Sequence, residues 1–223
     1  MPIFKTKNDN FFKKWSPEMA YVLGFFTADG SMTKNKRSAH FIEFQITDRD
    51  LLVKIRKALG SNHKITVRKR GEIWKTIFRL QIGSKEIYND LFALGLTERK
   101  SKTIKFPYVP NKYLSHFIRG YFDGDGNVTV SRYRRADRGG RLFKTILSGF
   151  VCGNKNFLKI LHQKLKRVAK LSGGILYYHD NGYRLTFSVK DSLALYRFIY
   201  HDVKNDLFLS RKKNKFEKYF NMI

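Results

Sequence analysis

Residues 22–30 read VLGFFTADG and residues 118–126 read IRGYFDGDG, so two apolar segments of the chain end in the same Asp-Gly pair. The likeness continues downstream in the same order. Each copy is followed by two strand-like runs, a helix-like run, two short alternating runs, a second helix-like run and a basic cluster. Self-similarity over so many elements indicates a duplicated unit. The sequence therefore predicts helix, two strands, helix, two strands, helix, twice over.

The chain offers one boundary between the copies. Pro107 and Pro110 lie close together in KFPYVPNKYL, near the middle of the 223 residues, and prolines at such spacing interrupt regular structure. We expect an N-terminal half over residues 1–112 and a C-terminal half over residues 113–223, with almost no linker between them. Each half is an α+β unit.

Composition limits the classes of function. Apolar residues make up 42% of the chain, which is enough for a folded core, and Lys plus Arg outnumber Asp plus Glu by 45 to 18, a net charge of +27. Such a surface favours a polyanion, and nucleic acid is the expected partner.

No membrane-spanning run or signal peptide is visible, so we expect no membrane partner and an intracellular location, in a prokaryotic cytoplasm or an organelle. A lone cysteine, Cys152, and scattered histidines argue against a disulfide framework and a zinc site.

The two motif segments carry small residues at helical spacing. Ala20, Gly24 and Ala28 form a stripe in the first copy, and Gly120 and Gly124 repeat part of it. Small residues let two helix backbones approach closely. The alternative is an ordinary amphipathic helix that packs on a sheet, but the duplication favours a helix pair.

Both predicted helices end on a carboxylate, where the helix dipole is already negative. Asp29 and Asp125 break this local rule in the same way. If the helices run side by side, the carboxylates converge, and hard oxygen ligands of this kind suit Mg²⁺. Gly30 and Gly126 are expected to cap the helices in the left-handed conformation. The alternative is that Asp-Gly is only a turn dipeptide.

These segments resemble the LAGLIDADG motif of homing endonucleases and maturases, and the two-motif layout is similar to the single-chain monomers of that family. The resemblance runs from about Ser16 to about Lys215. It implies a pseudo-twofold duplication of an αββαββα unit, with the motif helices at the central interface. It also implies two saddle-shaped antiparallel sheets that straddle DNA in the major groove.

The resemblance further implies roles for individual residues. Asp29 and Asp125 match the metal-binding carboxylates, and the carbonyl groups of Ala28 and Gly124 would also reach the metal. A polar residue after the second strand organises water in the family, and the matching positions here are Asp48 and Asn154. A lysine near the scissile phosphates would be Lys212 in the second half. In the first half Lys100 and Lys102 both remain candidates.

Strand alternation predicts the side chains that meet DNA, since residues two apart share a face. One face of each sheet is expected to contact the duplex, mostly at phosphates, through the following residues. They are Thr33, Asn35, Arg37, Glu43, Gln45, Thr66, Arg68, Arg70, Lys75, Ile77, Arg79 and Gln81 in the first half, and Thr129, Ser131, Tyr133, Tyr177, His179, Arg184, Thr186 and Ser188 in the second. We expect RYRRADRGGR (132–141) to be a basic loop, either over phosphate or solvated.

The function expected from the resemblance is site-specific cleavage of both strands of DNA at a long asymmetric target, which leaves short 3′ overhangs. Mg²⁺ is the expected cofactor, Mn²⁺ a substitute, and Ca²⁺ an ion that supports binding without cleavage. The expected partner is double-stranded DNA, bound by a monomer that needs no protein partner. The alternative is a non-cleaving protein of the same fold, either an intron RNA maturase or a DNA-binding regulator.

Overall fold

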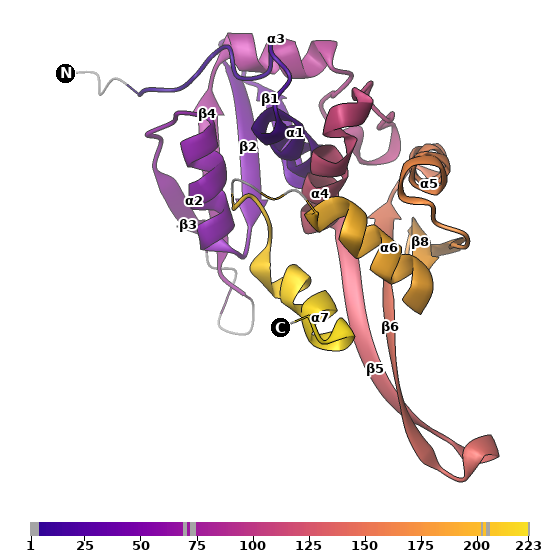
Figure 1. The fold of residues 1–223 in the computed structure, drawn as a ribbon. Coiled ribbons are helices and arrows are strands. Elements are labelled where there is room, and N and C mark those ends of the chain that lie inside the picture. The colour runs from indigo at the N-terminus through magenta and orange to yellow at the C-terminus, as the bar shows by residue number, and fades with distance from the viewer. Residues whose placement is uncertain (1–4, 69–70, 72–74, 202, 204–205, 223) are drawn as a thin grey trace. The chain divides into compact units, whose positions relative to one another are not determined.

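The computed structural model describes residues 5–68, 71, 75–201, 203 and 206–222. By Cα proximity the chain forms two compact units, Met1–Gly124 with Val203–Leu209, and Asp125–Asp202 with Ser210–Ile223. The order of elements confirms the predicted duplication (Figure 1), because each half runs αββαββα, with one helix added at the C-terminal end. The predicted halves follow the repeat, whereas the compact units follow contacts, so the helix of the second motif falls in the first unit.

The first unit contains a sheet of four antiparallel strands in the order β1-β2-β4-β3. Its elements are α1 (Pro17–Asp29), β1 (Gly30–Lys34), β2 (His40–Ile46), α2 (Arg49–Ala58), β3 (Ile65–Arg68), β4 (Ile77–Gly83), α3 (Lys85–Ala93), the short 3-10 helices η1 (Lys100–Lys102) and η2 (Asn111–Tyr113), and α4 (Leu114–Asp125). In the register of β2 and β4, Ile42 is opposite Ile82 and Phe44 opposite Leu80, and all four are buried. The alternating side chains give the sheet one core face and one open face.

Helix α1 begins where the local sequence directs it. Ser16 has an extended backbone, and its hydroxyl oxygen accepts a hydrogen bond from Met19 N at 3.1 Å. Pro17 follows at the first helical position, where its missing N–H costs nothing. The helix is then buried on nearly every side, from Met19 to Thr27.

The burial of α1 is explained by α4, which packs against it through the predicted small residues. A Cβ atom added at Gly24 would lie 2.0 Å from the carbonyl oxygen of Phe117. A Cβ atom at Gly120 would lie 2.0 Å from the carbonyl oxygen of Tyr21. The two glycines thus exchange equivalent contacts, and the backbones are close enough to exclude even a methyl group. This confirms the predicted helix pair.

A buried polar network fastens α4 to the first unit. The Tyr21 hydroxyl donates to Asp123 Oδ2 at 2.7 Å, and Leu209 N donates to the same oxygen at 2.9 Å. Arg119, 1% exposed, donates from Nε to the carbonyl oxygen of Leu207 at 3.0 Å. The segment ending at Leu209 is therefore held by charged side chains of α4, and such charge-assisted bonds are among the stronger ones in a protein interior.

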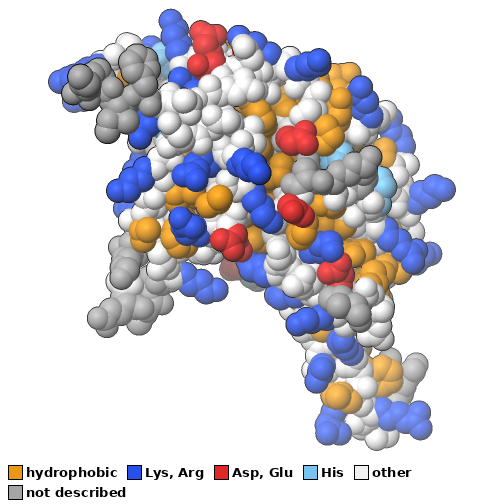
Figure 2. Space-filling model, turned by 60° about the vertical axis from the view of Figure 1, so that its left-hand side comes forward, with side chains coloured by type: hydrophobic (Ala, Val, Ile, Leu, Met, Phe, Trp, Pro, Cys, Tyr) orange, Lys and Arg blue, Asp and Glu red, His pale blue; other side chains and the backbone are white. Residues whose placement is uncertain are grey.

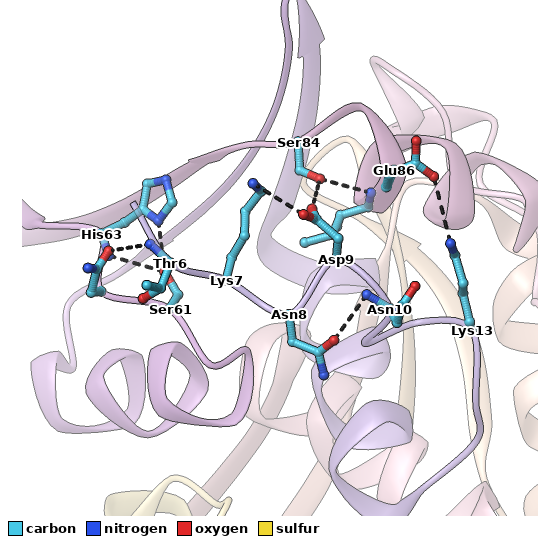
Figure 3. Close-up of polar contacts among 12 residues, drawn as sticks. Thr6, Lys7, Asn8, Asp9, Asn10, Lys13, Ser61, His63, Ser84 and Glu86 are labelled. Carbon is cyan, nitrogen blue, oxygen red and sulfur yellow. Dashed lines mark hydrogen bonds and ion pairs between the residues drawn. The ribbon is translucent and has the colours of Figure 1, made fainter. Parts of the chain in front are cut away.

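The segment before α1 is also fixed by polar contacts (Figure 3). The Asp9 carboxylate pairs with Lys7 at 3.3 Å and accepts a 2.5 Å hydrogen bond from the hydroxyl of Ser84. Ser84 is itself the N-cap of α3. On the other side of the segment, Thr6 N donates to the side-chain oxygen of Asn62 at 2.9 Å. The N-terminal segment thus bridges the start of α3 and the loop after α2.

The second unit repeats the plan with a sheet in the order β5-β6-β8-β7. Its elements are β5 (Gly126–Arg135), the 3-10 helix η3 (Ala136–Arg138), β6 (Arg141–Cys152), α5 (Lys155–Ala169), β7 (Ile175–His179), β8 (Gly182–Phe187), α6 (Val189–Tyr200) and α7 (Ser210–Phe220). Asp180 and Asn181 both have positive φ, as a two-residue hairpin turn between β7 and β8 requires. Among the residues that the structure describes, no helix is long and apolar enough to cross a membrane.

The two sheets differ in one respect. In the first unit β4 pairs with β2 from Phe41 to Ile46, so nearly the whole length of the β1–β2 hairpin has a third strand beside it. In the second unit β8 pairs only with Ser148–Cys152, yet β5 and β6 stay paired as far as Arg135 opposite Arg141. The stretch expected to be a loop is therefore mostly a two-stranded ribbon, which projects from its own sheet in Figure 1.

Candidate active site and nucleic-acid interface

The motif aspartates lie at the C-terminal ends of their helices. Asp29 is the exposed last residue of α1, and Asp125 is the half-buried last residue of α4. Gly30 does not adopt the expected left-handed cap: with φ −81° and ψ 153° it is extended and already begins β1. That expectation was wrong because the glycine serves a steric need, since a Cβ atom there would lie 2.3 Å from the ring of Phe26. Gly126 likewise begins β5.

A buried lysine touches the residue that follows each motif aspartate. Lys212 is 5% exposed, and its Nζ donates to the carbonyl oxygen of Gly126 at 2.6 Å. Lys100 is 8% exposed, and its Nζ donates to the carbonyl oxygen of Gly30. Lys102, the other candidate in the first half, is exposed. Of the two candidates in the first half, Lys100 is thus the one that repeats the contact of Lys212, while its catalytic role stays a prediction.

The space beside the Asp29 carboxylate is kept open by a glycine. A Cβ atom at Gly124 would lie 2.3 Å from Ala28 Cβ and 3.1 Å from Asp29 Oδ2. Gly124 and Ala28 are the two residues whose carbonyl groups the resemblance assigns to metal. Within the described residues no cluster of three His, Cys, Asp or Glu side chains forms. The groups near this helix end are the Asp29 carboxylate and the backbone carbonyls of Ala28 and Gly124, oxygen groups of the kind that suit a Mg²⁺ ion that keeps several waters.

Asp48 and Asn154 have a role that the sequence did not predict. Each is the N-cap of the helix that follows the second strand of its half. The Asp48 carboxylate accepts from Leu51 N at 3.3 Å, and the Asn154 side chain accepts from Asn156 N at 2.8 Å. A short polar side chain at this position is typical of helix starts. This capping role could have been read from the sequence, and the expected role of both residues in organising water stays a prediction.

The open face of the first sheet holds the residues that alternation predicted. The register places Glu43 opposite Gln81, Gln45 opposite Arg79, and Thr66 opposite Arg79. Thr33 of β1, Ile77 of β4 and Arg68 of β3 share this face. The strands thus bring polar and basic side chains from all four strands onto one surface.

Glu43 is the centre of that surface. It is only 9% exposed and forms an ion pair with Arg79. Gln81 donates to the same carboxylate at 3.3 Å, and Gln45 donates to its other oxygen. The four side chains therefore form one hydrogen-bonded cluster whose members hold each other in fixed orientations.

The open face of the second sheet is built in the same way. Tyr177 is opposite Arg184, and His179 lies next to the turn, where its Nδ1 is 2.6 Å from Asp180 Oδ2. Arg184 also pairs with Asp180, at 3.0 Å. Thr129, Ser131, Tyr133 and Thr186 share this face.

Four of the predicted contact residues lie elsewhere. Asn35 caps the β1–β2 turn by accepting from Arg37 N and Ala39 N, both at 2.9 Å, and Arg37 is exposed in that turn. Lys75 is exposed before β4, and Ser188 is the N-cap of α6. Arg70 lies outside the described residues.

Sequence reasoning missed large apolar side chains on the open face of the second sheet. Leu147 is 42% exposed and Ile175 70% exposed, and both belong to this face by register. A strand with apolar residues on both of its faces is typical of a sheet that is covered on both sides. The sequence RLFKTILSGFV (141–151) has this pattern, so these side chains could have been predicted. Figure 2 shows that hydrophobic side chains lie among many Lys and Arg on the surface it presents.

Part of the chain matches a known family model. Residues 16–93 match the LAGLIDADG-like domain. The uncharacterized protein MJ0398 of Methanocaldococcus jannaschii is 24% identical over 91% of this chain and 71% of its own length.

Solved structures share the fold over nearly the whole chain. The LAGLIDADG meganuclease I-AabMI bound to uncleaved DNA has a TM-score of 0.62 at 13% identity, with 93% of this chain and 90% of that chain covered. The homing endonuclease I-LtrWI bound to target DNA has a TM-score of 0.62 at 16% identity, with coverages of 96% and 91%. I-SmaMI bound to an uncleaved target with calcium ions has a TM-score of 0.57 at 13% identity, with coverages of 93% and 89%. Residues 16–93 therefore match the LAGLIDADG-like domain, and the chain as a whole shares the fold of the LAGLIDADG homing endonucleases.

Proposed function

We propose that this protein is a site-specific endonuclease that cleaves both strands of duplex DNA by divalent-metal-dependent hydrolysis. The observation that carries the proposal is the repeated end of the two motifs. An aspartate is followed by a glycine whose carbonyl oxygen accepts from a buried lysine, Lys100 in one half and Lys212 in the other. A protein that only bound nucleic acid would have no use for burying a cation against the glycine that follows each motif aspartate.

The motif carboxylates are the proposed metal ligands. Asp29 and Asp125 supply hard oxygen atoms, and the carbonyl groups of Ala28 and Gly124 add neutral oxygens at the same helix ends. A divalent ion bound by such ligands supplies water activation and neutralises charge on the phosphate. Mg²⁺ is the proposed ion, with Mn²⁺ as a substitute and Ca²⁺ as an ion that permits binding alone.

The lysines are the proposed positive charges for the transition state. Their carbonyl partners fix Lys100 and Lys212 in place, so they need no rearrangement as charge develops on the phosphate oxygens. Because the two lysines serve separate motifs, we propose one such reaction for each DNA strand. Cleavage then leaves short 3′ overhangs.

The open faces of the two sheets are the proposed DNA-binding surfaces. Basic side chains there are suited to phosphates, and the fixed cluster around Glu43 is suited to base edges, since a carboxylate accepts from cytosine and an arginine donates to guanine. The proposed partner is a long asymmetric duplex, because the two faces carry different residues. The net charge of +27 supports the same partner.

The test is selection of bound and cleaved DNA from a randomised duplex library, with Mg²⁺ in one arm and Ca²⁺ in the other. We expect a long target that is cut in Mg²⁺ and only bound in Ca²⁺. Asp29→Asn and Asp125→Asn should abolish cutting and keep binding. Asp50→Asn, an equal charge change at an exposed position of α2, is the matched control and should cut normally.

Two outcomes contradict the proposal. Specific binding with no cutting in Mg²⁺ or Mn²⁺ indicates a DNA-binding regulator. Absence of DNA binding, together with affinity for structured intron RNA, indicates a maturase.

A further inference from the structure

The two buried lysines at the motif ends are carried by strongly basic segments. Lys100 lies in TERKSKTIK (97–105), which has four Lys or Arg, and Lys212 lies in α7, SRKKNKFEKYF, which has five. Each segment has a single acidic residue. Like charges at neighbouring positions oppose regular structure in such a segment. Contacts with other elements must therefore keep each lysine in its place.

In both halves the single acidic residue of the segment accepts a hydrogen bond from a tyrosine. The Tyr88 hydroxyl donates to Glu98 Oε1 at 2.9 Å. The Tyr196 hydroxyl donates to Glu217 Oε1 at 3.0 Å. A carboxylate lowers the affinity of a basic segment for a polyanion, so nucleic-acid binding alone gives no reason for either glutamate. The repeated contact instead indicates a role in holding the segment.

The tyrosines lie on the same face of equivalent helices. Tyr88 is four residues after Ser84, the N-cap of α3, and Tyr196 is eight residues after Ser188, the N-cap of α6. Positions four residues apart lie on one helix face, one turn from each other. Equivalent faces of the two halves thus supply the hydrogen-bond donors.

The glutamates do not occupy equivalent positions. Glu98 precedes Lys100 by two residues, whereas Glu217 follows Lys212 by five. The duplication of the sequence therefore does not account for the matching contacts. A common requirement near the buried lysines does account for them.

In the second half the contact sets the rotation of α7 about its axis. Lys212 and Phe216, four residues apart, form the buried face of this helix. Tyr196 packs on Phe216 with ring centroids 5.5 Å apart, and it donates to Glu217, whose side chain is only 12% exposed. Because one tyrosine holds two successive residues of α7, the helix cannot rotate without breaking both contacts. Lys212 Nζ is thereby kept at the end of the second motif.

In the first half the contact adjoins an irregular turn. Arg99 lies between Glu98 and Lys100 and has φ 54°, a left-handed conformation that a residue with a Cβ atom adopts at a cost. The ring of Tyr88 makes an edge-on contact with His40, with ring centroids 4.6 Å apart. The strained residue is therefore fixed on both sides, by the contact of Glu98 before it and the contact of Lys100 after it.

Both tyrosine hydroxyls remain hydrogen-bond donors near neutral pH. Burial raises the pKa of Tyr88, and the hydrogen bond to Glu98 and the charge of Glu98 raise it further. Burial raises the pKa of Tyr196 to about 12, with the same two contributions from Glu217. The contacts therefore persist at the pH at which the protein works.

We propose that each tyrosine–glutamate pair positions the buried lysine of its own half for DNA cleavage. The pairs are Tyr88 with Glu98, and Tyr196 with Glu217. This inference rests on the proposed function. Each pair acts through its lysine and needs no contact of its own with phosphate or metal. Loss of one pair should therefore affect the cleavage of one DNA strand.

The test uses Tyr196→Phe, which removes the hydroxyl and keeps the ring on Phe216. Cleavage of each end-labelled strand of the selected target is followed in Mg²⁺ at saturating protein, and the dissociation constant is measured in Ca²⁺. We expect cleavage of the strand that Lys212→Met slows to fall by about tenfold, the effect of losing one hydrogen bond to a charged group. The other strand and the dissociation constant should not change. Tyr88→Phe should slow the opposite strand.

Two controls separate positioning from stability. Tyr219→Phe removes another hydroxyl of α7, which donates to the carbonyl oxygen of Lys144 at 3.1 Å, and it should cut both strands normally. Glu217→Gln keeps an oxygen acceptor for Tyr196 and should cut nearly as the wild type does, whereas Glu217→Ala should match Tyr196→Phe. Equal slowing of both strands, or an equal effect of Tyr219→Phe, would overturn the inference, because a general loss of stability explains either result.

A second readout reports on the lysines themselves and needs no cleavage. Reductive methylation of the free protein, followed by mass spectrometry, measures the accessibility of each amine. Lys212 is buried, so it should react slowly in the wild type and in Tyr219→Phe but about tenfold faster in Tyr196→Phe. Lys100 should respond in the same way to Tyr88→Phe alone. Unchanged protection of both lysines would overturn the inference.

The outcomes distinguish this inference from the proposed function. If the wild type cuts both strands and Tyr196→Phe is indistinguishable from it, this inference alone fails. If the wild type cuts no duplex in Mg²⁺, the proposed function fails, and the role of both pairs in cleavage fails with it.

Discussion

Lys212 donates a hydrogen bond of 2.6 Å to the carbonyl oxygen of Gly126, the residue after the second motif aspartate. Lys100 makes the same contact with Gly30. The two lysines come from different local structures, since Lys100 opens the short η1 and Lys212 lies in the first turn of α7. The repeated contact is therefore not a by-product of matching secondary structure, and a common role at the motif ends explains it.

Replacing either lysine should separate cleavage from binding. Lys100→Met or Lys212→Met removes a fixed positive charge and keeps an apolar stem of similar length, so we expect cleavage in Mg²⁺ to slow by about 10²- to 10³-fold. Affinity in Ca²⁺ should change only a few-fold. Each single variant should accumulate nicked duplex, because it affects one reaction of the two, and strand-specific end labels measure this.

The matched control for these variants is Lys102→Met, which alters an exposed lysine two residues away. It should cleave both strands at the wild-type rate. A Lys102→Met variant that lost activity while Lys100→Met kept it would reverse the assignment. Equal slowing on both strands by each single variant would contradict the proposal of one lysine per reaction.

The fold was predictable because its determinants are periodic and occur twice. The spacing of Gly24, Ala28, Gly120 and Gly124 predicted a close helix pair, and strand alternation predicted the open faces. The choice between Lys100 and Lys102 was not predictable from one sequence, because both lie in an irregular basic stretch. Their burial depends on how η1 packs against Phe26, whose ring centre lies 5.7 Å from Lys100 Nζ.

Two further predictions from the sequence were wrong, and both errors have local causes. Gly30 was assigned a left-handed cap, the commonest reason for a glycine after a helix, whereas its real constraint is the ring of Phe26 one turn earlier. Residues 132–141 were taken for a loop because their glycines and charges obscured a strand pattern that continues to Arg135. Like-charged residues opposite each other do not predict a ribbon, and only the register shows it.

Adding a methyl group at the contact between α1 and α4 should lower the stability of the protein. Gly24→Ala or Gly120→Ala would place a methyl group 2.0 Å from a backbone oxygen, so the helices must separate. We expect the free energy of unfolding to fall by about 1–3 kcal/mol or more, as in other overpacked cores. Urea denaturation of each purified variant measures this.

Gly83→Ala is the control for that pair, because the nearest atom to its added Cβ is a ring carbon of Phe41 at 3.4 Å. It should change the unfolding free energy much less than either helix variant. If Gly24→Ala and Gly83→Ala were equally stable, the close approach of the two helices would not be a determinant of the fold.

We expect the first unit to lose stability in acid because of His63, which lies near Lys5 and Lys7 of the N-terminal segment. Burial lowers the pKa of His63 below 6.5, and the nearby Lys7 and Lys5 lower it further. The folded protein therefore binds this proton less readily than the unfolded chain, so stability is full above pH 6.5 and falls as the pH drops from 6.5 toward the lowered pKa. NMR titration of the His63 ring gives the pKa directly.

Urea unfolding at pH 7.5 and 5.5 tests the consequence for stability. His63→Gln should lose less stability than the wild type between these values, and Lys7→Gln should show an intermediate loss because it removes one of the two lysine charges. A pKa for His63 at or above 6.5 would contradict the expectation.

Removing the charge of Glu43 should loosen DNA discrimination. The carboxylate holds Arg79 and Gln81 in place. Glu43→Gln frees Arg79 to bind any phosphate, so we expect tighter binding to mixed-sequence duplex and a steeper salt dependence, by roughly 1 in the log–log slope. Because the reading side chains lose their fixed orientation, the ratio of specific to non-specific affinity should fall by about 10-fold or more. Binding to the selected target and to mixed-sequence DNA in Ca²⁺ measures both effects.

The matched control is Asp50→Asn, which removes the same charge from an exposed position of α2 and should leave the ratio of affinities unchanged. A Glu43→Gln variant with wild-type discrimination would show that the cluster only stabilises the sheet.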